Sequence, residues 1–225
     1  MKIKGAIFDM DGTLVDSLFW WEKFWRDLGK KFLDKESFAP PQELDLKVRT
    51  MIFTEAMAYV KDALSIEASA EEVVSFAAQN LADFYRYTVK AKTGVYALLD
   101  GLSAMGVKLA LASATDMKYL KIALEACHLE KYFDTVLSCA DLGVGKDKPD
   151  IYLLSLKKLG VEAHECAVFE DSFVALETAK RAGFHTVGIY DANNYGQDRL
   201  RAASEIYLDQ TKGLDAVIPQ LTIEA

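Results

Sequence analysis

Two carboxylates near the start of the chain lie two residues apart, a spacing at which one can act as a nucleophile and the other can transfer a proton. Asp9 and Asp11 follow residues 3–8, an apolar segment that predicts a buried strand. Ligands of open α/β sheets bind in the crevice outside the carboxyl ends of the strands, so both side chains can converge there. One carboxylate then serves as nucleophile and metal ligand, and the other as proton carrier. The alternative is a strand that ends in an ordinary Asp-Gly turn.

A hydroxyl group follows a second predicted strand. Ser113 and Ala114 come after the apolar residues 107–112 and before a predicted helix. A hydroxyl beside backbone N–H groups that open a helix is suited to binding a phosphoryl oxygen. Because Ser and Thr are also common helix caps, this signal is weak by itself.

Two further carboxylates, Glu170 and Asp171, close a predicted strand at residues 166–169. Mg²⁺ takes oxygen ligands and usually keeps several waters. One or both of these carboxylates, together with Asp9 and the backbone carbonyl of Asp11, therefore predict a magnesium site. The alternative is an acidic pair that stabilises the start of a helix.

A charged loop at residues 143–149 carries Lys146 and Lys148. A lysine near two or more carboxylates can neutralise them and hold a phosphoryl group that is being transferred. Both lysines are candidates for this role. A solvated loop without a part in the chemistry is the alternative.

A parallel sheet is the element that would bring these residues together. After residue 107 predicted strands alternate with predicted helices, which is typical of a parallel sheet covered by helices. The fold class is therefore α/β. The predicted strands are 107–112, 135–138, 166–169 and 186–189, and the predicted helices are 118–127, 151–159 and 175–182.

A helix-prone region separates the first strand from the others. Its apolar periodicity predicts about four helices, one of them near residues 43–64, and its tryptophans and phenylalanines are expected to pack in a core. The chain therefore predicts a core domain of residues 1–16 and 93–225 that is interrupted by an α-helical cap of residues 17–92. The two junctions can act as hinges of a lid. A rigidly packed insert is the alternative.

The composition argues against several classes of partner. The chain has 225 residues, is 51% hydrophobic and carries a formal net charge of −8, so we expect neither nucleic acid nor a membrane as partner. No apolar run approaches the length of a membrane span, and the first strand is too short for a signal peptide. The cysteines, Cys127, Cys139 and Cys166, have no metal-ligand spacing and are too few for a disulfide framework. We therefore expect a cytoplasmic protein.

The string Asp-Met-Asp-Gly-Thr-Leu-Val-Asp-Ser, residues 9–17, resembles the first motif of the haloacid dehalogenase superfamily of phosphotransferases. The resemblance runs over most of the chain and implies a Rossmann-like three-layer core. An insert between the first two motifs resembles the helical-cap branch, which contains phosphoglycolate phosphatase and β-phosphoglucomutase.

Two later segments match further motifs of the family. Ser113 stands at the second motif, where Ala114 replaces the usual asparagine. Glu170 and Asp171 resemble the fourth motif in its Glu-Asp-Ser form.

The third motif favours one of the two lysines. When the match is anchored on residues 149–152, Lys146 takes the place of the family's lysine and Asp147 replaces a usual proline. Lys148 remains the alternative.

The resemblance implies a magnesium-dependent phosphatase that hydrolyses a small phosphorylated metabolite through an aspartyl-phosphate. Asp9 attacks phosphorus, Asp11 protonates the leaving group and then deprotonates water, and Lys146 and Mg²⁺ balance the charge. The implied metal ligands are Asp9, Asp11, Glu170 and Asp171, and the implied phosphoryl-binding residues are Ser113, Ala114 and Lys146.

Two other functions stay open. Members of the mutase group typically carry histidine and valine where this chain has Trp21 and Thr13, which favours the phosphatase. A catalytically silent binding module is the second alternative, and the intact site residues argue against it. Lys47 and Arg49 of the cap are candidates for binding the distal part of the substrate. The oligomeric state does not follow from the sequence.

Overall fold

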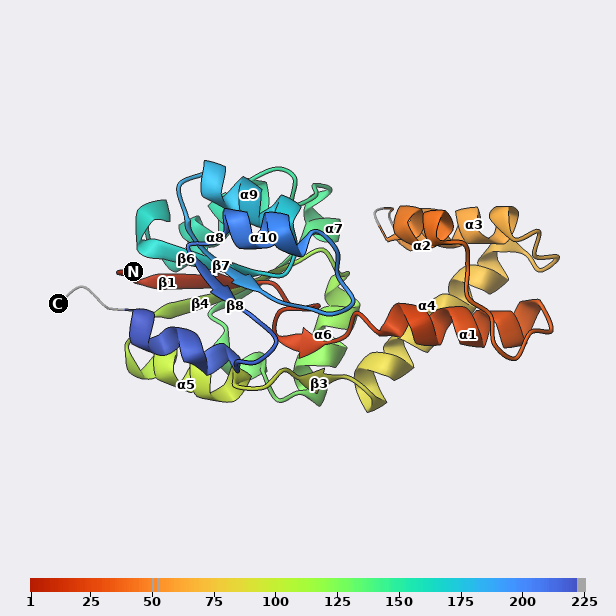
Figure 1. The fold of residues 1–225 in the computed structure, drawn as a ribbon, viewed down its shortest axis with the longest axis horizontal. Helices are drawn as coiled ribbons and strands as arrows, with labels where there is room; N and C mark the ends of the chain where they lie inside the picture. Colours follow the sequence, from red (N-terminus) through yellow and green to blue (C-terminus); the bar gives the residue numbers. More distant parts are fainter. Residues whose placement is uncertain (50, 52, 222–225) are drawn as a thin grey trace. The chain divides into compact units, whose positions relative to one another are not determined.

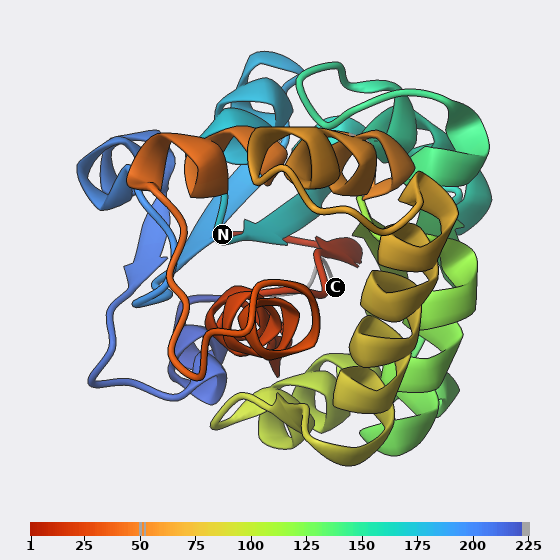
Figure 2. The same ribbon diagram turned by 90° about the vertical axis from the view of Figure 1, so that its right-hand side faces the viewer.

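The computed structural model describes residues 1–49, 51 and 53–221. The chain divides into two compact units, unit 1 with Met1–Leu18 and Val89–Ala225, and unit 2 with Phe19–Thr88. Figures 1 and 2 show the elements of each unit in the colours of the sequence. None of the helices in the described part of the chain has both the length and the apolar character that crossing a membrane requires. That unit 2 acts as a cap stays a prediction.

Unit 1 is built on a six-stranded sheet in which every neighbouring pair is parallel. The spatial order is β5-β4-β1-β6-β7-β8, so the first strand lies between partners that come much later in the chain. The residues of β1 are all buried, as expected for a strand covered on both faces. The strands are β1 (Gly5–Phe8), β4 (Lys108–Ser113), β5 (Thr135–Ser138), β6 (Cys166–Glu170), β7 (His185–Ile189) and β8 (Ile206–Leu208).

Helices cover both faces of this sheet (Figure 1). One layer contains α7 (Cys139–Leu142), α8 (Asp150–Leu159), α9 (Phe173–Arg181) and α10 (Gln197–Ala203), and the other contains α5 (Val95–Ala104), α6 (Met117–Ala126) and η3 (Leu214–Gln220). Short 3-10 turns, η1 (Glu130–Tyr132) and η2 (Ala163–Glu165), precede β5 and β6. The predicted fold class, an α/β three-layer core with a parallel sheet, is confirmed.

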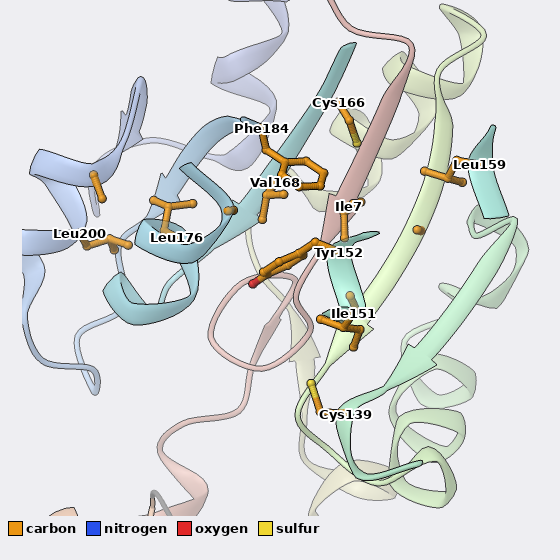
Figure 3. Close-up of a cluster of buried hydrophobic side chains, with 14 residues drawn as sticks. Ile7, Cys139, Ile151, Tyr152, Leu159, Cys166, Val168, Leu176, Phe184 and Leu200 are labelled. Carbon is orange, nitrogen blue, oxygen red and sulfur yellow. The ribbon is translucent and has the colours of Figure 1, made fainter. Parts of the chain in front are cut away.

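The core under the first layer of helices is continuous with the sheet. Ile7 and Val168 of the sheet and Tyr152 of α8 belong to one buried cluster, which Figure 3 shows in close-up. Tyr152 is fully buried although it carries a hydroxyl group, so that group needs a polar partner inside the protein.

A short antiparallel ribbon stands where the sequence predicts hinges. β2 (Val15–Asp16) pairs with β3 (Lys90–Ala91), with Val15 opposite Ala91 and Asp16 opposite Lys90. Both connections between the two units leave from this ribbon. Whether they open and close a lid stays a prediction.

Unit 2 is helical, as predicted. Its described helices are α1 (Trp20–Phe32), α2 (Gln42–Val48), α3 (Phe53–Ala63) and α4 (Ala70–Tyr87). Trp20, Phe24 and Trp25 of α1 are buried and in ring contact, so they pack in a core as expected. α4 begins with a capping box, in which Ser69 and Glu72 each accept a backbone N–H of the other.

The prediction of one helix near residues 43–64 is wrong. The structure has two helices, α2 and α3, and the N–H of Met51 bonds to the carbonyl of Val48, an i→i−3 turn that departs from the α-helical pattern. Residues 50 and 52, which lie outside the described residues, are the β-branched Thr and Ile. Such side chains lower helix propensity, and the periodic spacing of apolar residues does not reveal this reduced propensity.

Candidate active site

The register of the sheet brings the predicted strand ends to one edge. Phe8 of β1 lies level with Leu111 of β4 and with Phe169 of β6, and the N–H of Asp9 bonds to the carbonyl of Phe169 over 3.0 Å. The chain leaves β1 for β4 on one side and returns later to β6 on the other. This edge is therefore a topological switch point, where open α/β sheets bind their ligands.

An ammonium group bridges two of the carboxylates at this edge. The Nζ atom of Lys146 lies 2.5 Å from Oδ1 of Asp9 and also contacts Oε1 of Glu170. The Lys146 side chain is 11% exposed. Lys148, two residues further along the same loop, is exposed. Of the two candidate lysines, the structure therefore brings Lys146 to the carboxylates.

Three buried carboxylates converge here. Asp9, Glu170 and Asp171 each offer an oxygen atom, and these atoms lie within 4.8 Å of one another. All three residues are buried. Glu170 accepts further hydrogen bonds from the Tyr152 hydroxyl over 3.2 Å and from the N–H of Ser172 over 3.3 Å, which satisfies the buried tyrosine.

Burial and mutual repulsion act on the protonation of the cluster. Burial raises the pKa of Asp9 well above its ordinary value; Lys146 opposes this shift, and the neighbouring carboxylates add to it. Burial, then the charge of Glu170, raises the pKa of Asp171 to about 7. Burial alone would lower the pKa of Lys146, but Asp9 and Glu170 hold it well above its ordinary value.

The donor set fits a divalent cation. Asp9, Glu170 and Asp171 supply hard oxygen atoms, which are the ligands that Mg²⁺ prefers. Among the described residues, the Lys146 ammonium contacts Asp9 and Glu170, and burial raises the pKa of Asp9 and of Asp171 above their ordinary values, so the ionised carboxylates are only partly balanced by positive charge. A bound dication would supply it.

Asp11 is not one of these three carboxylates, and its side chain is held by two hydroxyl groups. Ser17 donates to Oδ1 over 2.6 Å, and Thr115 donates to Oδ2 over 2.8 Å. Its side chain is therefore oriented by the residues after β2 and after β4. The predicted use of its backbone carbonyl as a metal ligand stays a prediction.

Ser113 ends β4 at the same edge of the sheet. Its Oγ accepts the N–H of Thr115 over 3.1 Å, and the residue is buried. Ala114, which follows, is exposed, and α6 begins three residues later at Met117. The hydroxyl and the turn into the helix are thus present together, whereas their part in binding a phosphoryl group stays a prediction.

Gly12 is required by the geometry of the turn. Its φ is 78°, and a Cβ atom placed there would lie 2.2 Å from Oδ2 of Asp171. The turn also bonds the N–H of Gly12 to the carbonyl of Val15 over 3.0 Å. A glycine at this position therefore lets the backbone after Asp9 pass directly beside Asp171.

The sequence did not single out Asn194, although it contacts the site. Its Nδ2 atom donates to Oδ2 of Asp171 over 2.7 Å and to the backbone carbonyl of Asp171 over 3.2 Å. Thr13 donates to the other oxygen, Oδ1, over 3.3 Å. Asp171 follows β6 directly, whereas Asn194 lies five residues after the end of β7, so a search for polar residues at strand ends does not single it out.

The candidate substrate residues of unit 2 have partners within that unit. Nζ of Lys47 lies 4.1 Å from the ring centre of Tyr59, and Arg49 pairs with Asp45 over 2.7 Å. The guanidinium of Arg49 also lies 5.4 Å from the ring centre of Trp21. Their part in binding a substrate stays a prediction.

Comparisons with known proteins agree with this geometry. Residues 3–183 match the family model of haloacid dehalogenase-like hydrolases. A phosphorylated carbohydrates phosphatase of Thermotoga maritima is 31% identical over 90% of this chain and 92% of its own length. Hexitol phosphatase A of Escherichia coli is 25% identical over 84% of each chain. The structure of CbbY from Rhodobacter sphaeroides in complex with phosphate has the same fold, with a TM-score of 0.76 and 21% identity over 94% of this chain and 97% of its own.

Proposed function

Because this chain belongs to the haloacid dehalogenase-like hydrolases, we propose that it is a magnesium-dependent phosphatase that cleaves a small phosphomonoester through an aspartyl-phosphate. The observation that carries this function is the position of the Lys146 ammonium between Asp9 and Glu170, in a group of three buried carboxylates. Such a concentration of buried charge is costly for stability and is typical of catalytic sites.

In the first step Asp9 is the nucleophile. One of its carboxylate oxygens attacks phosphorus in line with the leaving group, the new O–P bond forms, and the bond from phosphorus to the ester oxygen breaks. The electron pair of the broken bond stays on the ester oxygen, which takes a proton from Asp11. The hydroxyl groups of Ser17 and Thr115 orient Asp11 for this transfer.

In the second step water hydrolyses the aspartyl-phosphate. Asp11, now ionised, removes a proton from the water that attacks phosphorus, and Asp9 leaves as a carboxylate. The products are inorganic phosphate and the free alcohol. Asp11 is then protonated and ready for the next substrate.

Lys146 and Ser113 hold the phosphoryl group during both steps. The Lys146 ammonium faces Asp9 and would neutralise charge on the phosphoryl oxygens as it does on the carboxylates. The Ser113 hydroxyl and the N–H groups of Ala114 and the following turn are donors for another oxygen. Lys148 has no part in this function.

Mg²⁺ would be held by side-chain oxygens of Asp9 and Asp171, by Glu170 directly or through water, and by the backbone carbonyl of Asp11. When bound, it supplies positive charge to the phosphoryl oxygens and to the neighbouring carboxylates. The residues themselves provide the nucleophile, the acid and the base.

The substrate is a phosphorylated sugar or polyol, and unit 2 acts as the cap that selects it. Support comes from the printed activities of the relatives, which concern phosphorylated carbohydrates and a hexitol phosphate. Lys47 and Arg49 are the candidates within unit 2 for its polar groups. The compartment is the cytoplasm, in keeping with three buried, free cysteines.

Phosphate release tests this function. Wild type, Asp9→Asn and the control Asp198→Asn, an exposed residue of α10, are given hexose and hexitol phosphates, phosphoglycolate, a nucleotide and an aryl phosphate, with Mg²⁺ or with EDTA. We expect magnesium-dependent release that Asp9→Asn lowers by at least about 10³-fold, as loss of a nucleophile does. Mass spectrometry of acid-quenched wild type should place the phosphoryl group on Asp9.

The same assay distinguishes the alternatives. Conversion of a hexose 1-phosphate into its 6-phosphate faster than phosphate appears would make the protein a mutase. Binding of ligand without turnover of any substrate would make it a binding module. Release that is equal for wild type and Asp9→Asn contradicts the catalytic assignment.

A further inference from the structure

Asp171 is clamped by hydrogen bonds on both of its carboxylate oxygens. Asn194 donates to Oδ2 over 2.7 Å, and Thr13 donates to Oδ1 over 3.3 Å. Asn194 also holds the backbone carbonyl of Asp171 over 3.2 Å. Because each carboxylate oxygen keeps a second lone pair, the clamp orients Asp171 and leaves it able to bind a cation.

The loop that carries Asn194 is held in shape by Asp191. Oδ1 of Asp191 accepts the N–H of Asn193 over 2.8 Å, and its carbonyl accepts the N–H of Asn194 over 3.2 Å. Gln197, at the start of α10, donates to the carbonyl of Asp191 over 3.1 Å and to that of Asn194 over 3.3 Å. The position of the Asn194 side chain therefore depends on that of Asp191.

Asp191 in turn forms an ion pair with Lys92. The Nζ atom of Lys92 lies 2.7 Å from Oδ2 of Asp191, and the two side chains are 14% and 3% exposed. Lys92 also donates to the carbonyl of Tyr190 over 3.2 Å. The pair joins the segment after β3 to the loop after β7, two parts of unit 1 that are far apart in the sequence.

The backbone of Lys92 completes a closed ring of contacts. Its N–H bonds over 2.9 Å to the carbonyl of Leu14, and Leu14 follows Thr13, the second residue of the clamp. The ring thus runs from Asp171 through Asn194, Asp191 and Lys92 to the turn after Asp9, and back to Asp171 through Thr13.

From this ring we infer that the Lys92–Asp191 pair is a positioning device for the metal-binding carboxylate of Asp171 and acts through Asn194. Replacing a buried ion pair by apolar residues often leaves stability unchanged or improves it, so stability alone gives no reason for the pair. A carboxylate that must bind a cation gains from a fixed orientation, and partners of metal ligands commonly provide it. This role rests on the function proposed above.

Calorimetric titration of the metal-free protein with Mg²⁺ and with Mn²⁺ tests the inference directly. Asn194→Ala should raise the dissociation constant about 10- to 100-fold, as loss of a partner of a metal ligand does. Lys92→Met and Asp191→Asn should each raise the dissociation constant by a smaller factor, about 3- to 10-fold, because these residues act on Asp171 only through Asn194. Lys92→Arg keeps the charge and should stay within about twofold of wild type.

Two controls separate positioning from general damage. Lys4→Met removes the same kind of group from the Lys4–Glu165 pair, also 2.7 Å long, and should leave the dissociation constant unchanged. The double variant of Lys92→Met and Asn194→Ala should bind no more weakly than Asn194→Ala alone, because the effect of Lys92 passes through Asn194. Circular dichroism and the melting temperature establish that each variant is folded.

The possible results are distinct. Equal dissociation constants for Lys92→Met and Lys4→Met, or multiplied effects in the double variant, overturn the positioning role. A wild type that binds Mg²⁺ tightly but releases no phosphate contradicts the proposed function, while the ranking of the variants still decides the positioning role. A wild type that binds neither ion contradicts both.

Discussion

The two ends of β1 and β6 differ in how charged side chains are arranged. At the amino ends of β1 and β6, Lys4 and Glu165 form an exposed pair, with side chains 47% and 21% accessible. At the carboxyl ends, Asp9, Glu170 and Asp171 are buried together, and the ammonium of Lys146 contacts Asp9 and Glu170. The pair at the amino ends balances one charge with one charge, whereas the cluster at the carboxyl ends is short of positive charge.

This difference indicates that the charges at the amino ends contribute slightly to stability, whereas those at the carboxyl ends serve the chemistry. An exposed ion pair contributes about 0–1 kcal/mol, because water screens it and two long side chains lose freedom. Burying several like charges destabilises a fold, and such an arrangement persists where it serves a function. Variants at the carboxyl ends should therefore change turnover and metal binding. Variants at the amino ends should change both properties little.

After Asp9→Asn, the largest effect expected at the carboxyl ends is that of Asp11→Asn. The value of kcat/KM covers departure of the leaving group, so for an alkyl phosphate it should fall about 10²- to 10⁴-fold when the acid is lost. An aryl phosphate, whose leaving group needs no proton, should lose much less. Phosphate release measured on both substrates checks this, and equal losses would contradict the role of Asp11 as an acid.

The two lysines of one loop provide a matched comparison. Lys146→Met should lower kcat/KM about 10²- to 10³-fold, because a donor aimed at the transferring group is removed. Lys148→Met, the same change at an exposed position, should stay within about twofold of wild type. The reverse ranking in the steady-state assay would transfer the role to Lys148.

The pH dependence of stability should reflect the crowded carboxylates. The pKa of Asp171 is raised to about 7 in the folded protein, so between about pH 4 and pH 7 the folded state binds a proton that the unfolded state has lost. The free energy of unfolding of the metal-free protein should therefore fall as pH rises through this window, by about 4 kcal/mol for this group.

Denaturant unfolding in EDTA at pH 5 and pH 8 measures this effect. Asp171→Asn should show a smaller fall, because the titrating group is gone. Mg²⁺ should restore more stability at pH 8 than at pH 5, since it competes with protons for the same oxygens. A metal-free wild type that gains stability between these two pH values would contradict the charge shortage.

Comparison of Gly12→Ala with Gly106→Ala separates the cost of backbone strain from the cost of a steric clash with a neighbouring side chain. Both glycines have positive φ, but a Cβ atom on Gly106 would meet nothing within 4 Å, whereas one on Gly12 would overlap Asp171. Gly106→Ala should cost about 1 kcal/mol of unfolding free energy, and Gly12→Ala should cost more, up to about 3 kcal/mol. Only Gly12→Ala should also weaken Mg²⁺ binding, which titration calorimetry would detect.

The smallest effect should come from the amino ends. Lys4→Met should change the free energy of unfolding by less than about 1 kcal/mol and leave turnover unchanged. Denaturant unfolding at low and high salt is the measurement, and the difference from wild type should shrink as salt is added. A large loss of activity in Lys4→Met would remove the contrast between the two ends.

The fold was predictable because its signals are local. The apolar segments that became β1, β4, β5, β6 and β7 are short runs bounded by polar residues, and alternation with helices indicated the parallel sheet. Asp9, Ser113 and Glu170 stand at the ends of such runs, so their shared edge followed from the sheet itself. The break between α2 and α3 did not, because apolar periodicity continues across it.

The supporting contacts could not be predicted in the same way. Lys92 and Asp191 are 2.7 Å apart in space, yet neither has a neighbour in the sequence that marks it as paired. β8 has three residues, too few for a periodic signal. Pairings of this kind depend on the register of strands and on loop geometry, which arise only when distant segments meet.

The position of β1 in the sheet also sets an order of events during synthesis. Unit 2 is one continuous segment that is complete at Thr88, whereas β1 lies between β4 and β6, and β6 begins only at Cys166. At about 5–20 residues per second, roughly 8–30 s separate the translation of β1 from that of its second partner. During that time the apolar segment of β1 is attached to the ribosome and lacks one of its two neighbouring strands. The chemistry of Asp9 is therefore among the last properties that the growing chain acquires.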